Sequence, residues 1–348
     1  MVKHLRNPPV ISLTPSSLRF LDQTRLPAEE IVVETADYRR VLEAIRALRV
    51  RGAPLIGIAA AYGVTLAARE LFATTSSDPH AQLRVVCDQF AATRPTAVNL
   101  FWALERMRGI IDRTADAAGL VSALETEARI LHEDDARRCA AIGRHGMEVL
   151  PGSGGVITHC NTGALATGGD GTAFSVLRAA HRAGKNIHVF ADETRPLLQG
   201  ARLTMWELKR AGIPSTLITD STAAMLMRQG RVQAAITGAD RIAANGDSAN
   251  KIGTYGLAVA ARHHGIPFYI AAPLSTVDMD IASGGDIPIE ERAAEEITDW
   301  GGRRIAPEGV PCYTPAFDVT PAELITGIVT ERGICAPPFD ETLRALFP

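Results

Sequence analysis

The second half of the chain alternates short apolar runs with helical patterns, and this alternation limits the possible folds most strongly. Five runs rich in apolar and β-branched residues follow Gly155, at residues 156–158, 187–190, 216–219, 234–237 and 268–271. Helical patterns separate them at residues 172–183, 203–211, 223–228 and 250–264. Such alternation predicts βαβ units and a parallel sheet. Because the runs are continuously apolar, we expect a Rossmann-like α/β domain with helices on both faces of the sheet.

The first part of the chain is mostly helical by its pattern. Apolar residues at helical spacing predict a helix over 37–50, with Asp37 as its N-cap. Further helical patterns cover residues 55–73, 82–92, 97–112 and 122–150, and a short strand is expected at 31–34. A segment rich in Gly and Pro, 151–155, then interrupts the pattern. We therefore predict a mostly helical domain over residues 1–150 and the α/β domain over residues 151–348.

Composition excludes several classes of protein. The net charge of −3 gives no electrostatic basis for nucleic-acid binding. The apolar stretch 55–68 is shorter than the roughly 20 residues that a bilayer requires, and residues 1–9 lack a signal-type apolar core. The five cysteines are widely spaced and form no C-x-x-C pair, so neither a disulfide framework nor a zinc site is expected. These features predict a cytoplasmic protein without a membrane partner.

Polar segments follow all five predicted strands, at residues 159–163, 192–196, 220–222, 238–241 and 273–276. Ligands bind beyond the carboxyl ends of parallel strands, so a small-molecule site is predicted at this edge of the sheet. The sequence has no dinucleotide or Walker fingerprint, no metal-ligand spacing and no G-x-S-x-G motif. We therefore expect neither a nucleotide cofactor, nor a metal, nor a serine hydrolase.

Cys160 and Asp240 are the residues at these strand ends with the strongest chemical potential. Cys160 opens a loop rich in Gly and Thr, where backbone donors can lower a thiol pKa. Neighbouring residues of a strand point to opposite faces, so His159 is expected to be a packed, hydrogen-bonded side chain and not the base for Cys160. Asp240 either pairs with Arg241 or caps a turn, or it is desolvated and serves in general acid/base chemistry.

Three further segments could bind an anion. Asn250 and Lys251 follow an Asn-Gly turn at the predicted start of a helix, which favours an anion site or a simple N-cap. Gly52 lets a ligand approach the backbone beside Arg51, and Arg94 lies at a second corner between helices. A guanidinium at either corner could bind a phosphate through two hydrogen bonds, although each corner alone also fits a structural loop.

The sequence around these residues resembles the methylthioribose-1-phosphate isomerase family. The matching segments are RGAPLIG from Arg51, THCNTGALAT from Thr158, DETRPLLQGARLT from Asp192, GADRIAANGDSANKIGTYGLA from Gly238 and IPIEER from Ile287. The resemblance implies conversion of 5-methylthioribose 1-phosphate to its ketose in methionine salvage, by a homodimer without metal or organic cofactor. It implies catalytic roles for Cys160 and Asp240. It also implies substrate binding by Arg51, Gly52, Ala53, Arg94, Gln199, Asn250 and Lys251.

Two positions depart from the family pattern. Asp170 stands where a tyrosine is commoner, and Ser221-Thr222 stands where Asn-Met is expected. They leave open a related substrate, 5-deoxyribose 1-phosphate or ribose 1,5-bisphosphate. The choice between proton transfer and a hydride shift also stays open. The same fold is shared with regulatory subunits of a translation-initiation guanine-exchange complex, so a non-catalytic binding subunit is the alternative from another class. The intact motifs around Cys160 and Asp240 favour the enzyme.

Overall fold

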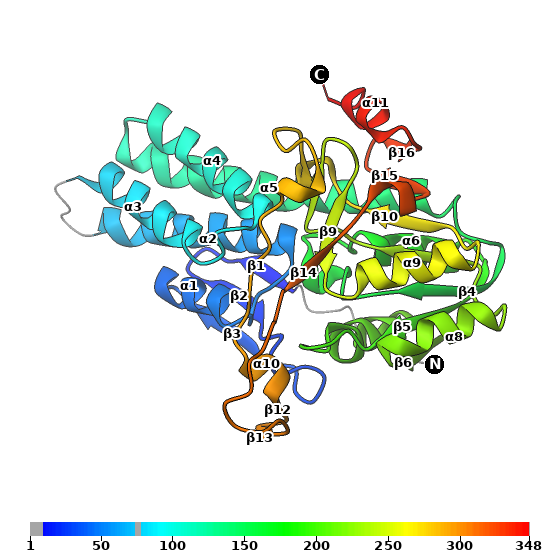
Figure 1. Cartoon of the computed structure of the whole chain (residues 1–348). Helices are drawn as coiled ribbons and strands as arrows, with labels where there is room; N and C mark the ends of the chain where they lie inside the picture. The colour runs from blue at the N-terminus through cyan, green and yellow to red at the C-terminus, as the bar shows by residue number, and fades with distance from the viewer. Residues whose placement is uncertain (1–9, 74–77, 348) are drawn as a thin grey trace, which may run out of the picture. The chain divides into compact units, whose positions relative to one another are not determined.

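The computed structural model describes residues 10–73 and 78–347, except for the side chains of residues 117 and 118 (Figure 1). The expectation for residues 1–9 lies outside this range. Contacts divide the chain into an N-terminal unit, residues 1–136 with 164–168, and a Rossmann-like unit, residues 137–163 with 169–348. Helix α5 (Ala117–Gly146) runs across the division, so the domain boundary after residue 150 stays a prediction.

The N-terminal unit combines a small antiparallel sheet with long helices. The strands are β1 (Ile11–Leu13), β2 (Leu18–Leu21) and β3 (Val32–Thr35), paired in that order. The helices are α1 (Tyr38–Arg46), α2 (Ala53–Ala73), α3 (Pro79–Ala91), α4 (Val98–Arg113) and α5. The Asp37 carboxylate accepts a hydrogen bond from the backbone N–H of Arg39, which confirms Asp37 as the N-cap of α1.

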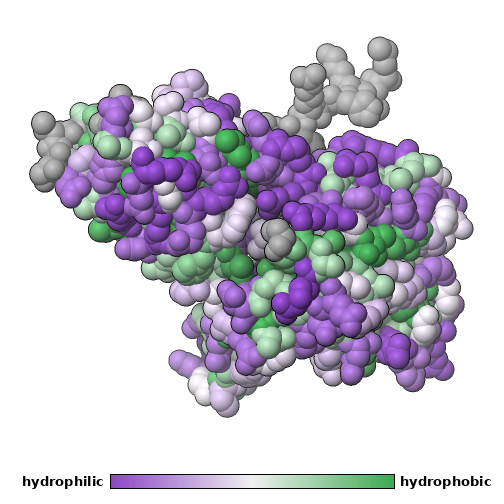
Figure 2. Space-filling view, turned by 90° about the horizontal axis from the view of Figure 1, so that it is seen from above, coloured by the Kyte–Doolittle hydropathy of each residue, from purple (hydrophilic) through white to green (hydrophobic). Residues whose placement is uncertain are grey.

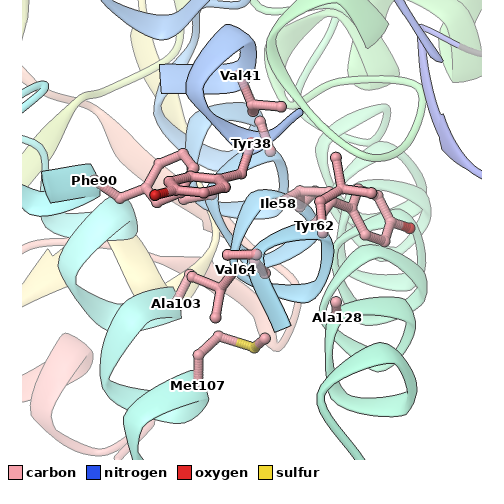
Figure 3. Close-up of a cluster of buried hydrophobic side chains, with 14 of the residues drawn as sticks. Tyr38, Val41, Ile58, Tyr62, Val64, Phe90, Ala103, Met107 and Ala128 are labelled. Atoms are coloured by element: carbon pink, nitrogen blue, oxygen red, sulfur yellow. The ribbon is translucent and has the colours of Figure 1, made fainter. Parts of the chain in front are cut away.

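Helix α2 is the centre of the N-terminal core. Every residue from Leu55 to Ala68 is buried, and α1, α3 and α4 pack against the helix. Figure 3 shows part of this core, including Tyr62 of α2 and Phe90 of α3. By length and composition, α2 alone among the helices of residues 10–73 and 78–347 could cross a membrane. Its burial within the unit instead identifies it as a core helix.

The main sheet of the Rossmann-like unit has seven strands in the order β16-β15-β10-β7-β4-β5-β6. They are β4 (Ser153–Thr158), β5 (Asn186–Asp192), β6 (Ser215–Ile218), β7 (Ala234–Thr237), β10 (Phe268–Ala271), β15 (Gly327–Thr330) and β16 (Gly333–Cys335). All neighbouring pairs are parallel except β15 with β16. The five predicted strands are therefore present, and the predicted fold class is confirmed.

Helices cover both faces of this sheet. They are α6 (Ala173–Arg182), α7 (Met205–Ala211), α8 (Ala223–Arg228), α9 (Thr254–His263) and α11 (Phe339–Arg344). A further short helix, α10 (Glu295–Thr298), lies between α9 and α11 in the chain. Val156 of β4 packs in a core cluster with α6 and α7, whereas the next residue, Ile157, packs in a cluster with α8 and α9. Successive side chains of one strand thus enter two cores, which explains the continuously apolar runs. Outside these cores, hydrophilic residues dominate the molecular face in Figure 2.

A second sheet corrects one sequence prediction. Its order is β11 (Val277–Asp278), β8 (Arg241–Ala243), β9 (Ser248–Lys251) and β14 (Phe317–Thr320), and β12 (Asp299–Trp300) pairs separately with β13 (Arg303–Arg304). Asn250 and Lys251 therefore end a strand, and the prediction that they open a helix is wrong, because α9 begins only at Thr254. The reason is the tight turn at Gly246, whose φ of 91° reverses β8 into β9.

Candidate active site

The strand order of the main sheet reverses between β4 and β7. From β4 the chain continues through β5 to β6 on one side, and from β7 it continues through β10 to β15 on the other. Ligands bind outside the carboxyl ends of strands at such a switch point. Cys160 follows β4 by two residues, and Asp240 follows β7 by three. The two predicted catalytic residues therefore come from the two strands that flank the switch point.

The loops that carry these residues are in contact. A Cβ atom added to Gly238, directly after β7, would lie 2.8 Å from Cγ2 of Thr162 in the Cys160 loop. The Asp240 side chain is half-buried, and its backbone N–H donates to the carbonyl of Ala249 at 2.9 Å. Arg241 forms an ion pair with Asp278 at 3.5 Å.

Cys160 has an unusual backbone conformation for a residue with a side chain. Its φ is +64°, in the left-handed region, and its side chain is only 9% exposed. Such a conformation costs on the order of 1–3 kcal/mol and persists where the surroundings fix it. Here the Cys160 N–H donates to Oγ1 of Thr194 at 2.9 Å, and its carbonyl accepts from Oγ1 of Thr204 at 2.6 Å. Two threonines that follow β5 thus hold both backbone polar groups of Cys160.

Asn161 and Gly163 attach the same loop to a buried carboxylate. The amide of Asn161 donates to Oε2 of Glu207 at 2.5 Å, and both side chains are buried. A Cβ on Gly163 would lie 2.1 Å from the same carboxylate oxygen, so a glycine is required for this close approach. The loop that begins at Cys160 is therefore fixed at Cys160, Asn161 and Gly163.

His159 is buried and hydrogen-bonded, as predicted. Its Nε2 lies 2.9 Å from the carbonyl oxygen of Ile252, and its Nδ1 lies 3.0 Å from Oδ2 of Asp192. A carbonyl only accepts, so Nε2 carries a hydrogen. Burial opposes a charge on His159, but its hydrogen bond to Asp192 and the charges of Asp192 and Asp220 raise its pKa above the usual value. Burial also raises the pKa of Asp192 to about 6, against the effect of His159.

The same region contains a group with potential metal-ligand atoms. Across residues 10–73 and 78–347, His159, Asp192 and Asp220 form the one such group found, with ligand atoms within 4.8 Å of one another. Asp220, however, accepts the backbone N–H groups of Thr194 and Arg195 at 2.7 Å each. Oδ1 of Asp192 is buried without a hydrogen-bond partner among the described residues. Because Asp220 accepts two backbone N–H groups and His159 is hydrogen-bonded to the other oxygen of Asp192, we assign the group as a hydrogen-bonded network.

Gln199 is buried close to the same loops. It is 6% exposed, and in the described part of the chain its Oε1 has no hydrogen-bond partner. It directly precedes a π-helical turn, Gly200–Thr204, which leads into α7. Single π-helical turns occur frequently at functional sites, and a buried carbonyl oxygen without a partner calls for an explanation.

Asn250 and Lys251 are buried at the end of β9. Nζ of Lys251 donates to the carbonyl of Ala316 at 2.8 Å and lies 4.6 Å from the ring centroid of Phe317. The Asn250 amide donates to Oγ1 of Thr254 at 3.0 Å. The predicted anion site at a helix start is therefore wrong in its geometry, because both residues belong to a strand. Their roles toward substrate stay predictions.

The other predicted binding residues belong to the N-terminal unit. Arg51 is half-buried before α2, Ala53 begins that helix, and Arg94 is half-buried in the turn between α3 and α4. Gly52 has a φ of +100°, and a Cβ there would lie 2.4 Å from Cα of Ala166. Packing against Ala166 therefore accounts for this glycine without a ligand.

Both departures from the family pattern have local partners. The carboxylate of Asp170 forms an ion pair with Arg178 of α6 and lies 3.9 Å from Arg182. Oγ1 of Thr222 lies 2.7 Å from Oγ1 of Thr219. The two substitutions thus form contacts of their own within the Rossmann-like unit.

Comparison with known proteins identifies the family. The model of the Initiation factor 2 subunit family matches residues 49–337. The methylthioribose-1-phosphate isomerase of Geobacter metallireducens is 55% identical over 331 residues, which cover 94% of this chain and 95% of that protein. The isomerase of the same name from Heliobacterium modesticaldum is also 55% identical, over 94% of this chain and 96% of its own length. The chain belongs to the Initiation factor 2 subunit family, among the methylthioribose-1-phosphate isomerases.

Solved structures confirm the isomerase fold. The 5-methylthioribose 1-phosphate isomerase of Pyrococcus horikoshii is 46% identical with a TM-score of 0.91, covering 99% of this chain and 97% of that chain. A structure titled translation initiation factor eIF-2B, subunit delta, from A. fulgidus is 43% identical with a TM-score of 0.86, covering 97% and 98%. The predicted resemblance to the isomerase family is therefore confirmed.

Several residues of the isomerase-family loops were left without a role by sequence reasoning. They are Thr194, Thr204, Glu207 and Asp220, which contact the Cys160 loop or each other in the structure. Thr194 and Thr204 lie inside the family segment that begins at Asp192, which was the available signal. Asp220 begins the polar segment after the third predicted strand, which was its signal. Glu207 had no such signal, because its partner Asn161 is distant in sequence.

Proposed function

We propose that this chain is a methylthioribose-1-phosphate isomerase, which converts 5-methylthioribose 1-phosphate to 5-methylthioribulose 1-phosphate in methionine salvage. The observation that carries the proposal is 55% identity over 94% of the chain to proteins of that name. The positions of Cys160 and Asp240 beside the switch point of the sheet support it, because ligands of such sheets bind there.

The substrate defines what the site residues must do. Its anomeric oxygen carries the phosphate, so the ring cannot open to a free aldehyde and the bond from C1 to the ring oxygen must break. In the net reaction, hydrogens leave C2 and the C2 hydroxyl, and hydrogens arrive at C1 and the ring oxygen. The same number leaves and arrives, so no oxidant is needed.

Asp240 is our candidate for the group that moves these protons, since a half-buried carboxyl group accepts a proton when ionised and donates one when protonated. Cys160 is the candidate second participant, as proton shuttle or as stabiliser of the transition state. The tightly held backbone of Cys160 supports a role that depends on an accurate position of the thiol.

Substrate binding is proposed for the seven residues implied by the family. Gln199 has direct support, because its buried Oε1 could accept a hydrogen bond from a sugar hydroxyl. Arg94 and Lys251 are proposed to hold the phosphate. Arg51, Gly52, Ala53 and Asn250 complete the set. Arg94→Lys should raise KM strongly, because an ammonium cannot replace the two parallel hydrogen bonds of a guanidinium. Unchanged kinetics would remove Arg94 from the set.

Turnover by the purified chain tests the proposal. With chelator present, 5-methylthioribose 1-phosphate should be converted with a higher kcat/KM than 5-deoxyribose 1-phosphate or ribose 1,5-bisphosphate. Absence of turnover on all three would overturn the assignment as an enzyme. A preference for one of the other two substrates would show that the proposed substituent at C5 of the substrate is wrong. Activity lost to the chelator and restored by a divalent ion would contradict the expected lack of a metal.

The same reaction in deuterium oxide separates the two routes for hydrogen. Proton transfer through Asp240 predicts deuterium at C1 of the ketose, whereas a hydride shift keeps the hydrogen that was on C2. Proton NMR of the C1 methylene group measures the difference.

We also propose that the enzyme is a cytoplasmic homodimer. This rests on the family alone. Light scattering should give about twice the chain mass of 37.1 kDa, and a monomer mass would contradict it.

A further inference from the structure

The backbone around Cys160 is strained in two loops at once. The non-glycine residues with positive φ in the described part of the chain are Leu48, Cys160, Thr194 and Leu198. Three of these four belong to the loops that follow β4 and β5. A positive φ is a clear outlier for a β-branched residue such as Thr194, whose φ is +65°. Strain of this kind persists only where the surrounding structure imposes it.

Asp220 imposes the conformation of Thr194. Its two carboxylate oxygens accept the N–H groups of Thr194 and Arg195, each at 2.7 Å. Hydrogen bonds from backbone amides to an ionised carboxylate are stronger than those between neutral groups. Asp220 lies after β6, so it supports from the neighbouring strand the turn that follows β5.

Thr194 in turn fixes Cys160. Its side chain is fully buried, and its hydroxyl donates to the carbonyl of Asp192 at 3.1 Å. Having given its one hydrogen, the hydroxyl oxygen accepts the N–H of Cys160 at 2.9 Å. A continuous series of hydrogen bonds therefore leads from Asp220 through Thr194 to the backbone of Cys160.

We propose that Thr194 and Asp220 are positioning residues, which hold Cys160 in the left-handed conformation that directs its thiol to the substrate. The proposal rests on the proposed isomerase function. If the series is broken, Cys160 can relax toward an ordinary negative φ, and its Cβ and thiol then change direction. A displacement of about 1 Å at a reacting group can cost on the order of a hundredfold in rate.

The matched pair Thr194→Val and Thr194→Ser tests the hydroxyl. Valine keeps the branched shape but cannot accept the Cys160 N–H, so we expect kcat to fall at least about tenfold. Serine keeps the hydroxyl, so kcat should recover to within about threefold of the wild type, with KM changed little in both variants. Equal kcat in valine and serine variants would overturn the proposal, since a purely structural role gives no rescue by the hydroxyl.

Asp220→Asn tests the first member of the hydrogen-bond series and remains informative if Thr194→Val fails to fold. The amide can accept one backbone N–H but presents its own NH₂ group to the other, so kcat should fall in the same direction by a smaller factor. Elemental analysis accompanies this variant. A metal bound in equal molar amount to the wild type and absent from Asp220→Asn would overturn the assignment, because Asp220 would then be a ligand.

Alkylation of the Cys160 thiol provides a readout that does not require turnover. Mass spectrometry of the peptide containing Cys160, with the half-buried Cys312 as internal reference, should show faster labelling in Thr194→Val than in Thr194→Ser. Equal labelling of the two variants would contradict the positioning role. A wild type without isomerase activity but with this labelling difference would overturn the proposed function alone.

Discussion

Each unit of the molecule contains a histidine that donates to a backbone carbonyl, yet the pKa values of the two rings are shifted in opposite directions. His132 in the N-terminal unit lies 3.0 Å from the carbonyl of Gly168, and His159 in the Rossmann-like unit lies 2.9 Å from that of Ile252. The other ring nitrogen of His132 meets the hydroxyl of Tyr62 at 2.8 Å, whereas that of His159 meets the carboxylate of Asp192. One partner is neutral and the other is acidic.

Burial opposes a charge on both rings, but the carboxylate partner of His159 raises the pKa of that ring against the effect of burial. Burial raises the pKa of Tyr62 to about 12, so its hydroxyl stays protonated and can donate to His132. Burial lowers the pKa of His132 below the usual value, and its ring is neutral near pH 7. His159 has a raised pKa beside Asp192. The same residue type is thus a neutral anchor for the segment before Gly168, and part of a proton-holding pair beside Cys160.

The largest effect on stability is expected for His159→Ala. It leaves the Asp192 carboxylate buried without its ring partner, and removing one member of a buried pair typically costs about 3–5 kcal/mol. Urea unfolding should show a loss of this size in the free energy of unfolding. A loss of about 2 kcal/mol or less would contradict a charged or proton-sharing pair and place His159 with His132 as a neutral anchor.

A smaller effect is expected for His132→Ala. It removes the partners of the Tyr62 hydroxyl and the Gly168 carbonyl, at about 2 kcal/mol in the free energy of unfolding. Tyr62→Phe is the matched control, because it removes one hydroxyl and should cost about 1 kcal/mol. If His132→Ala proves as costly as His159→Ala, the distinction between the two anchors is lost.

The smallest expected effect is on how the free energy of unfolding changes with pH. The two histidines change it in opposite directions. His132 has a lowered pKa in the folded state, so the unfolded chain binds its proton first and stability falls as pH drops below about 6.5. His159 has a raised pKa, so its contribution is complete below about 6.5 and is lost as pH rises through the folded-state value. Asp192, Asp220 and Asp318 are the carboxylates that interact with it.

Stability curves of two glutamine variants measure this difference. His132→Gln should reduce the loss of stability on the acid side, and His159→Gln should reduce the loss on the alkaline side. Changes of the same sign in both variants would show that the two rings do not differ in protonation.

The contrast also marks the limit of what sequence can predict. Five of the seven strands of the main sheet were predicted, because burial on both faces makes them continuously apolar. The remaining two, β15 and β16, were not predicted. Strand β9 was missed, because its residues Ser248–Lys251 are mostly polar and its pairing with β14 joins segments distant in sequence. An apolar pattern carries no signal for such a strand.

The residues of the candidate site also fall into a predictable group and an unpredictable group. Cys160 and Asp240 were identifiable because they follow strands of a parallel sheet within family segments. Their supporting contacts were not, because the partner of Cys160 at Thr194 is 34 residues away and that of Asn161 at Glu207 is 46 residues away. Such contacts depend on how loops pack, which neither periodicity nor a short motif reports.

The central claim is that Asp240 performs acid/base chemistry in an isomerase, and kcat of Asp240→Asn on 5-methylthioribose 1-phosphate tests it most directly. Asparagine keeps the size of the side chain but cannot carry the proton, so kcat should fall at least about a hundredfold while KM changes little. Asp278→Asn, which alters the carboxylate partner of Arg241, is the matched control and should keep kcat within about threefold. Near-normal kcat in Asp240→Asn would contradict the account.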